Sequence, residues 1–233
     1  MNLLIVIPAY NEETNIVKVV ENIKSCSAVH QKYIVINDGS NDRTASICKD
    51  AGFPLLDLAT NLGLADAIQA GMQYASKHGY DAVLQFDGDG QHNAKYITSL
   101  CETMEREYCD IVIGSRFVHK KMPVSFRMAG ASLLKFLIWI TTGCNISDPT
   151  SGMRLFNKKM IEDFAWNLNF GPEPDTLVYL MRQGAKIIEV PVKMNERHGG
   201  ESYLNFANAL RYMLHMCVSI LFVQWFRKKK GAR

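Results

Sequence analysis

The stretch VLQFDGDGQH, residues 83–92, places a mostly apolar run directly before two carboxylates, Asp87 and Asp89. Residues two apart in an extended chain point to the same side, so both carboxylates can project from a strand end into one small volume. Two negative charges there repel each other unless a cation lies beside them. A hard divalent ion, Mg²⁺ or Mn²⁺, suits these ligands because it completes its shell with water and substrate phosphates. A solvated acidic turn is the alternative interpretation.

Other short apolar runs have the same arrangement, in which polar residues follow a strand. Helix-length connections join the runs, which predicts an α/β fold with a mainly parallel sheet, right-handed crossovers and flanking helices. Ligands of such sheets bind beyond the carboxyl ends of the strands, so the chemistry is expected at one rim. The other runs are LLIVI (3–7), YIVIN (33–37), PLLDL (54–58) and DIVIG (110–114).

The chain of 233 residues is 48% hydrophobic and can bury a substantial core. The strand pattern continues to residue 115 and predicts a nucleotide-binding part. Apolar helices, a loop DPTSGMR (148–154) and a strand IIEV (187–190) follow. We therefore expect one domain over residues 1–203, with parts 1–115 and 116–203. An apolar helix with a basic tail is expected over 204–233.

Charge and cysteine content indicate the class of binding partner and the cellular compartment. The net charge is only +3, and basic residues gather beside apolar runs, which favours an anionic membrane surface over nucleic acid as a partner. The six cysteines lack metal-binding spacing, and the N-terminus lacks the features of a signal peptide. These features predict a reducing, cytoplasmic location.

Six blocks carry a resemblance to a known family. In this order, they resemble the family 2 glycosyltransferases of GT-A fold, and most closely the polyprenyl-phosphate sugar transferases such as dolichol-phosphate mannose synthase. The resemblance runs from Ile5 to about Asn205 and implies a Rossmann-like GT-A domain that binds a nucleotide sugar. The blocks are PAYNEE, INDGSNDRT, FDGDGQH, GSRF, DPTSGMRLF and ERHGGESYLN.

The resemblance assigns residues to the nucleotide sugar. Asp87 would contact the nucleotide or the metal, Asp89 would be the main metal ligand, and Gln91 would lie near the sugar. His92 is either a site residue or a surface histidine. The residues implied to hold the base and ribose are Pro8, Tyr10, Glu12 and Asp38.

Two segments of this region have structural alternatives. The sequence Asp38-Gly39-Ser40 also fits a turn in which Ser40 or Asn41 caps a helix that begins near Arg43. Leu64 stands where many relatives carry a basic residue. Asp66 either faces the sugar or base, or belongs to a helix N-terminus.

The acceptor and the diphosphate are expected near basic residues. The resemblance places Arg116, Arg154, Arg197 and Ser202 there, and Tyr203 replaces the usual lysine of the family. A guanidinium binds phosphate through two donors at once. For Arg154, an ordinary surface salt bridge is the alternative.

The segment GPEPDT (171–176) offers Glu173 and Asp175 as a catalytic base. A sugar hydroxyl acceptor needs such a base, whereas a lipid phosphate is already an anion. Acidic residues that favour the dipole of a helix N-terminus are the alternative. The residues expected to carry catalysis are Asp89, Arg116, Glu173 and Asp175.

Two apolar segments, residues 130–143 and 212–226, are each shorter than the about twenty residues that span a bilayer. We expect amphipathic helices at a membrane interface. The alternatives are core helices or a contact with another copy of the chain or with a membrane-anchor partner.

These observations predict an inverting, metal-dependent hexosyltransferase. It would move a hexose or N-acetylhexosamine from a nucleotide sugar, UDP-linked rather than GDP-linked, to polyprenyl phosphate at the cytoplasmic face of the membrane. One alternative is transfer to a hydroxyl of a lipid-linked or cell-wall glycan. Another is a non-catalytic, membrane-associated subunit that binds nucleotide sugar.

Overall fold

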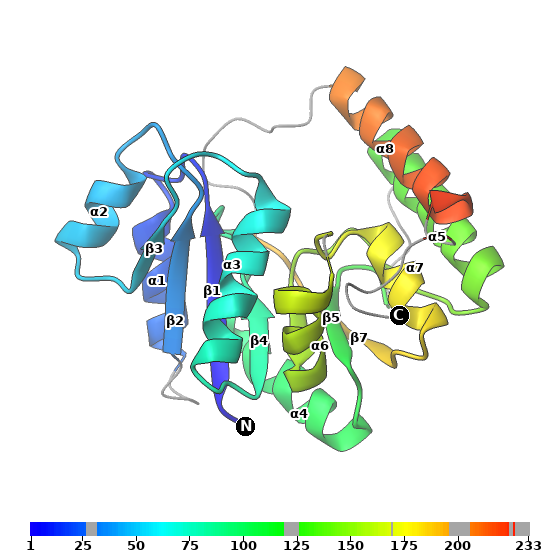
Figure 1. Ribbon diagram of the computed structural model, residues 1–233, viewed down its shortest axis with the longest axis horizontal. Coiled ribbons are helices and arrows are strands. Elements are labelled where there is room, and N and C mark those ends of the chain that lie inside the picture. Colours follow the sequence, from blue (N-terminus) through cyan, green and yellow to red (C-terminus); the bar gives the residue numbers. More distant parts are fainter. Residues whose placement is uncertain (27–31, 119–125, 169, 196–205, 224–225, 227–233) are drawn as a thin grey trace.

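The computed structural model describes residues 1–26, 32–118, 126–168, 170–195, 206–223 and 226. A seven-stranded sheet in the order β3-β2-β1-β4-β6-β5-β7 forms its centre (Figure 1). The expected mainly parallel sheet is confirmed, because within these ranges only β6 runs antiparallel to its neighbours, β4 and β5. The strands are β1 (Leu3–Ala9), β2 (Lys32–Asn37), β3 (Leu55–Asp57), β4 (Ala82–Gln85), β5 (Ile111–Ser115), β6 (Arg154–Asn157) and β7 (Ile187–Pro191).

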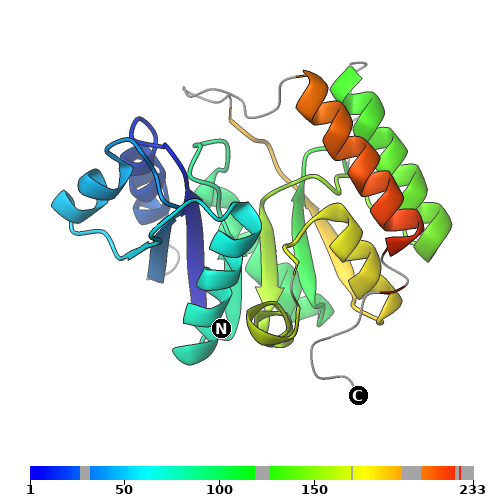
Figure 2. The ribbon, with the colours of Figure 1, turned by 45° about the horizontal axis from the view of Figure 1, so that its top comes forward.

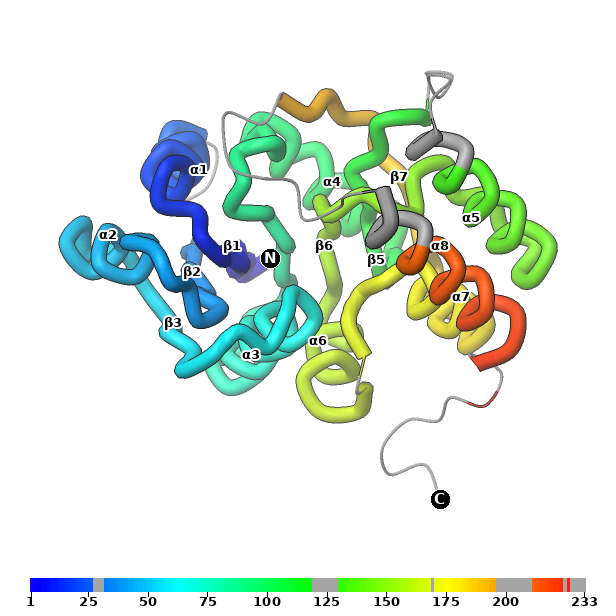
Figure 3. The backbone as a smooth tube through the Cα atoms, turned by 90° about the horizontal axis from the view of Figure 1, so that it is seen from above, coloured from blue at the N-terminus to red at the C-terminus, as the bar shows by residue number. Residues whose placement is uncertain are grey.

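Helices cover both faces of the sheet (Figure 3). Alternate residues of β1 supply two separate cores: Leu4 and Val6 pack with α3, α6 and α7, whereas Ile5 and Ile7 pack with α1 and α4. The helices are α1 (Ile16–Ser25), α2 (Thr44–Asp50), α3 (Leu64–Lys77), α4 (Ile97–Glu107), α5 (Phe126–Thr142), α6 (Lys158–Glu162), α7 (Pro174–Arg182) and α8 (Phe206–Leu221).

The expected loop over residues 148–154 is confirmed up to residue 153, but the strand β6 that follows it was not predicted. Arg154 is its first residue and pairs with Gln85 of β4 on one side and Ile113 of β5 on the other. The strand follows a Gly- and Pro-containing loop and spans only four residues, so the local sequence gave a weak signal. Its position brings the loop 148–153 beside the carboxyl end of β4.

Helix α2 begins where the sequence predicts, near Arg43, but its capping residue differs from the prediction. The helix begins at Thr44, its N-cap residue is Arg43, and the side chain of Asp42 accepts the Thr44 N–H through Oδ1 at 2.9 Å. Ser40 instead accepts the N–H of Asn11 at 2.9 Å. Neither Ser40 nor Asn41 is the cap, since the loop after β2 is tied to the loop after β1.

Helices α5 and α8 lie side by side at one end of the molecule and contact α7 (Figure 2). None of the helices in the described ranges combines the length and the apolar character required to cross a bilayer.

We expect Gly71→Ala to lower the free energy of unfolding by about 1–3 kcal/mol, the usual cost of overpacking. A Cβ at Gly71 of α3 would lie 2.4 Å from Cγ1 of Val6 on β1. This steric clash lowers stability, whereas the higher helix propensity of alanine relative to glycine raises it by about 1 kcal/mol. Urea unfolding monitored by circular dichroism measures the change.

The compensating control is Val6→Ala, alone and combined with Gly71→Ala. The smaller side chain makes room for the new methyl group, so the double variant should lose less stability than the sum of the two single variants. Additive losses would contradict the contact.

Candidate active site at the carboxyl ends of the strands

The turn after β4 is held by its own polar groups. Gln85 Nε2 donates to Asp87 Oδ1 at 2.9 Å, and the N–H of Gln91 donates to Asp89 Oδ1 at 3.0 Å. Gly88 allows the turn to lie against β1, because a Cβ there would be 2.9 Å from the carbonyl oxygen of Pro8. The turn therefore presents both carboxylates at the rim predicted from the sequence.

His92 is buried, so the surface-histidine interpretation is wrong. Its Nδ1 accepts the N–H of Asp87 at 3.0 Å, and its ring meets Phe86 edge to face at 5.3 Å. In the neutral ring the proton therefore lies on Nε2, which is 3.6 Å from Asp87 Oδ2. His92 thus shapes the turn that carries Asp87.

Asp87 and Asp89 fit a divalent ion that shares its coordination with a substrate. Both side chains are partly exposed at the end of β4. Among the described residues, no cluster of three or more His, Cys, Asp or Glu could hold a metal by itself. Two carboxylates suit Mg²⁺ or Mn²⁺ when water and phosphate oxygens supply the remaining ligands.

The residues expected around the base and ribose lie at the ends of β1 and β2. Asp38 is buried, and its two oxygens accept the N–H groups of Leu62 and Gly63, each at 2.8 Å. Glu12 is also buried and accepts Asn15 Nδ2 at 2.7 Å. Both carboxylates thus support the loops of this rim.

Tyr10, Asp66 and Gln91 lie nearer the surface. Tyr10 and Gln91 are partly exposed. Asp66 is exposed in the first turn of α3, where its charge favours the helix dipole. Arg197, Ser202 and Tyr203 lie outside the described residues.

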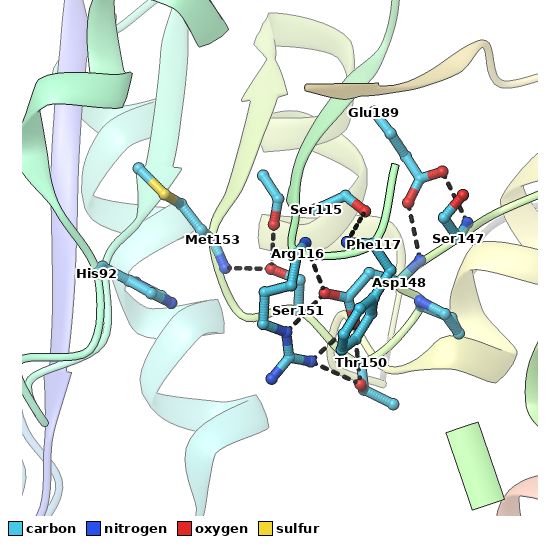
Figure 4. Close-up of polar contacts among 12 residues, drawn as sticks. His92, Ser115, Arg116, Phe117, Ser147, Asp148, Thr150, Ser151, Met153 and Glu189 are labelled. Atoms are coloured by element: carbon cyan, nitrogen blue, oxygen red, sulfur yellow. Dashed lines mark hydrogen bonds and ion pairs between the residues drawn. The ribbon is translucent and has the colours of Figure 1, made fainter. Parts of the chain in front are cut away.

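Arg116 is bound by a buried carboxylate (Figure 4). Its Nε donates to Asp148 Oδ2 at 2.7 Å and its Nη2 donates to Asp148 Oδ1 at 2.8 Å. These hydrogen bonds raise the pKa of Arg116, and Asp148 is fully buried. The bidentate geometry expected for a phosphate is therefore used by Asp148, whose role the sequence analysis missed.

Arg154 is buried in β6, so the surface salt bridge is wrong. Its Nε donates to the carbonyl of Ser151 at 2.8 Å and its Nη2 donates to the carbonyl of Pro149 at 2.6 Å. Burial lowers the pKa of the guanidinium. Carbonyl groups, rather than a carboxylate, hold this cation in place.

A pocket of about 70 Å³ lies between the ends of β4 and β6 and the start of α7. Glu173 lines it and accepts the hydroxyl of Tyr212 at 2.5 Å. Asp175 is buried and accepts Ser219 Oγ at 2.5 Å, away from the lining. Among the residues that line the pocket are Gln85, Gly152, Arg154, Glu173 and Tyr212.

Gln85 and Tyr212 are among the lining residues that the sequence analysis did not single out. Gln85 is a polar residue inside an apolar strand, which is a signal that could have identified it. Tyr212 had no local signal, because its role depends on how α8 packs beside α7.

We expect Gly152→Ala to weaken Mn²⁺ binding in the presence of a nucleoside diphosphate by about tenfold or more without unfolding the protein. A Cβ at Gly152 would lie 2.2 Å from Asp87 Oδ2 and would displace that carboxylate. A displacement of about 1 Å typically costs a hundredfold in an active site. Electron paramagnetic resonance measures bound Mn²⁺, and a thermal melt checks the fold. Unchanged Mn²⁺ affinity would contradict Asp87 as a ligand.

Comparisons with known proteins agree with this geometry. The family model described as Glycosyl transferase family 2 matches residues 4–164. An undecaprenyl-phosphate mannosyltransferase of Micrococcus luteus is 27% identical over 221 residues, which cover 88% of each chain. A UDP-N-acetylglucosamine–dolichyl-phosphate N-acetylglucosaminyltransferase of Methanococcus voltae is 26% identical over 215 residues, which cover 82% of this chain and 84% of that protein.

A solved structure shares the fold. Glucosyl-3-phosphoglycerate synthase of Mycobacterium tuberculosis, in complex with Mn²⁺, UDP and phosphoglyceric acid, superposes with a TM-score of 0.72 at 16% identity. The match covers 96% of this chain and 78% of that one. With the family match over more than half of its length, the chain belongs to glycosyl transferase family 2 and is a glycosyltransferase of GT-A fold.

Proposed function

We propose that the protein is an inverting, metal-dependent transferase that moves a hexose or N-acetylhexosamine from a nucleotide sugar to polyprenyl phosphate. UDP is favoured over GDP, and the reaction takes place at the cytoplasmic face of the membrane. The observation that carries the proposal is that the Asp87/Asp89 pair lies next to a polar pocket, with Gln85 and Gly152 contacting Asp87 and lining the pocket. The names of the relatives support the lipid acceptor.

The proposed metal dependence is supported by how the arginines are used. Displacement of a nucleoside diphosphate needs positive charge near the leaving group. Three donors of Arg116 face Asp148, and two donors of Arg154 face carbonyl groups. Mg²⁺ or Mn²⁺, held by Asp87 and Asp89, would neutralise the developing charge.

The acceptor determines whether Glu173 acts as a base. A polyprenyl phosphate attacks as an anion and needs no base, so Glu173 would only shape the pocket. A second candidate function is transfer to a glycan hydroxyl, which the position of Glu173 in the pocket favours. Asp175 suits a base less well, because Ser219 donates to it in a buried contact. The intact Asp87/Asp89 pair opposes the non-catalytic alternative.

The proposed membrane contact is the apolar surface of α5 and α8, which we call the apolar face. Large side chains on these adjacent helices are exposed although both helices pack on the domain. Such a surface fits an interfacial contact with lipid, where the acceptor is found. A second copy or a membrane-anchor partner is the competing occupant. The apolar face comprises Leu133, Phe136, Trp139, Ile140, Leu214, Val218, Leu221 and also Phe222, which directly follows α8.

We expect Glu173→Gln to keep most of the lipid-phosphate transfer and Asp89→Asn to lower it by a factor of about 100 or more. The assay uses Mn²⁺, polyprenyl phosphate in detergent and labelled nucleotide sugars, with label counted in the organic phase. Loss of lipid transfer in Glu173→Gln, with transfer to glycan hydroxyls in the native protein, would favour the second function. Failure of the native protein to transfer any sugar would contradict the proposal.

We expect the double variant Trp139→Asp, Val218→Asp to lose vesicle binding, because charges in the apolar face oppose insertion. Sedimentation with vesicles of phosphatidylglycerol and phosphatidylcholine measures the bound fraction. The control is Tyr108→Asp, which changes an exposed aromatic residue at the end of α4. A variant that still binds vesicles but changes oligomeric state would assign the face to a second copy.

A further inference from the structure

We propose that Glu189 of β7 is a positioning residue for the transfer reaction, and that it acts through Asp148 to direct Arg116 at a phosphate group of a substrate. The inference rests on the proposed function, in which the donor and the acceptor both carry phosphate. Glu189 lies on the last strand in the order of the described sheet, and the sequence analysis assigned it no role.

A charged side chain at this position of β7 needs an explanation. The neighbouring residues Ile188 and Val190 pack against the core on one side of the sheet. Ile187 packs against the core on the other side, and Glu189, two residues further along the strand, points to that same side. Glu189 is partly buried, and a carboxylate loses free energy there unless hydrogen bonds replace its water.

Both carboxylate oxygens of Glu189 hold the loop that precedes β6 (Figure 4). Oε2 accepts the N–H of Ser147 at 2.7 Å, and Oε1 accepts the N–H of Asp148 at 2.8 Å. Hydrogen bonds to an ionised carboxylate are stronger than those to a neutral acceptor. The backbone of Asp148 is therefore held in place from a different strand of the sheet.

Asp148 in turn holds Arg116. The buried carboxylate of Asp148 accepts three N–H groups of Arg116, from the backbone at 3.0 Å, from Nε at 2.7 Å and from Nη2 at 2.8 Å. Nη2 also donates to Thr150 Oγ1 at 3.2 Å. Since the direction of the Asp148 carboxylate depends on its backbone, Glu189 and Asp148 together determine where the guanidinium lies.

One nitrogen of Arg116 is left for a ligand. Nη1 has no hydrogen bond to any residue that the structure describes, and the side chain is 31% exposed. In Figure 4 this nitrogen points away from Asp148 and Thr150. A phosphate can meet two nitrogens of a free guanidinium, but here it can meet only one. A single contact orients a phosphate poorly, so the residues that hold the guanidinium must supply the direction.

The segment after Glu189 reaches the rim that carries the carboxylate pair. The N–H of Val192 donates to the carbonyl of Ser115 at 2.9 Å, and the N–H of Asn195 donates to the carbonyl of Gln91 at 2.8 Å. The segment therefore contacts both the end of β5 and the turn after β4. Glu189 thus belongs to an element that joins the two sides of the site.

The first test is Glu189→Ala. We expect it to weaken the binding of one phosphate substrate about tenfold and to leave the other within about twofold, because a displacement of about 1 Å can cost about a hundredfold in an active site. The KM for polyprenyl phosphate is measured in the transfer assay with Mn²⁺, and calorimetry gives the affinity for the nucleotide sugar. The substrate that is weakened identifies whether Arg116 faces the acceptor phosphate or the diphosphate.

Two controls separate positioning from charge and stability. Glu107→Ala removes a surface glutamate that pairs with Arg106 and Lys186, and it should change neither constant. Gly71→Ala lowers stability in α3, away from the loop before β6, and should also leave both constants unchanged. If Glu189→Ala does not fold, Glu189→Gln replaces it, because the amide keeps one acceptor oxygen and should give a smaller loss for the same substrate.

The second test asks whether Glu189 acts through Arg116. Arg116→Lys keeps a cation beside Asp148 but cannot present a second nitrogen. We expect Glu189→Ala to weaken the same substrate by less than about twofold when it is added to Arg116→Lys. A tenfold loss in both backgrounds, an equal loss for both substrates, or unchanged constants in Glu189→Ala would overturn the inference alone. A native protein that binds neither UDP nor GDP with Mn²⁺ would overturn the proposed function and the inference that rests on it.

Discussion

The antiparallel pairing of β6 with β4 is the constraint on which the site depends. Its register places Arg154 opposite Gln85 and brings Gly152 against Asp87. A shift of one residue would turn Arg154 to the other face of the sheet. The same strand pairs with β5, whose end carries Arg116, and the loop before β6 carries Asp148. One short strand thus joins strands β1–β4 to strands β5 and β7.

Buried charge is the cost of this arrangement. Asp148 is fully buried, and removing Arg116 would leave it without its cation, a change that typically costs about 3–5 kcal/mol. Arg154 is buried without a directly bonded carboxylate, and burial lowers its pKa. A core of apolar residues would be more stable at such positions. Their polar character is therefore better explained by ligand binding and positioning than by stability.

The sequence predicted the parts that depend on local pattern. The runs at residues 3–7, 33–37, 82–86, 110–114 and 187–190 became strands with ends shifted by at most two residues, because continuous apolar runs leave little choice. The spacing of Asp87 and Asp89 predicted that both carboxylates would lie at the end of one strand, which is where the structure places them. Strand β6 and the roles of Asp148 and Tyr212 were missed, since they arise from pairing across the sheet and from helix packing. Arg116 and Arg154 were both predicted to bind phosphate, but Arg116 is paired with Asp148 and Arg154 with backbone carbonyl groups. Asp148 comes from a segment that only the fold brings beside Arg116.

Helix α8 links the apolar face to the pocket. Tyr212 and Ser219, both on α8, donate to Glu173 and Asp175 at the start of α7. Burial, with the Glu173 carboxylate next in importance, raises the pKa of Tyr212, so its hydroxyl keeps its proton and remains a donor. The helix that exposes Leu214 and Val218 therefore also orients the carboxylate on the pocket wall. These two side-chain hydrogen bonds connect α8 to the start of α7. A displacement of α8 along α7 would therefore break the hydrogen bond between Tyr212 and Glu173 without requiring any change in the strands of the sheet.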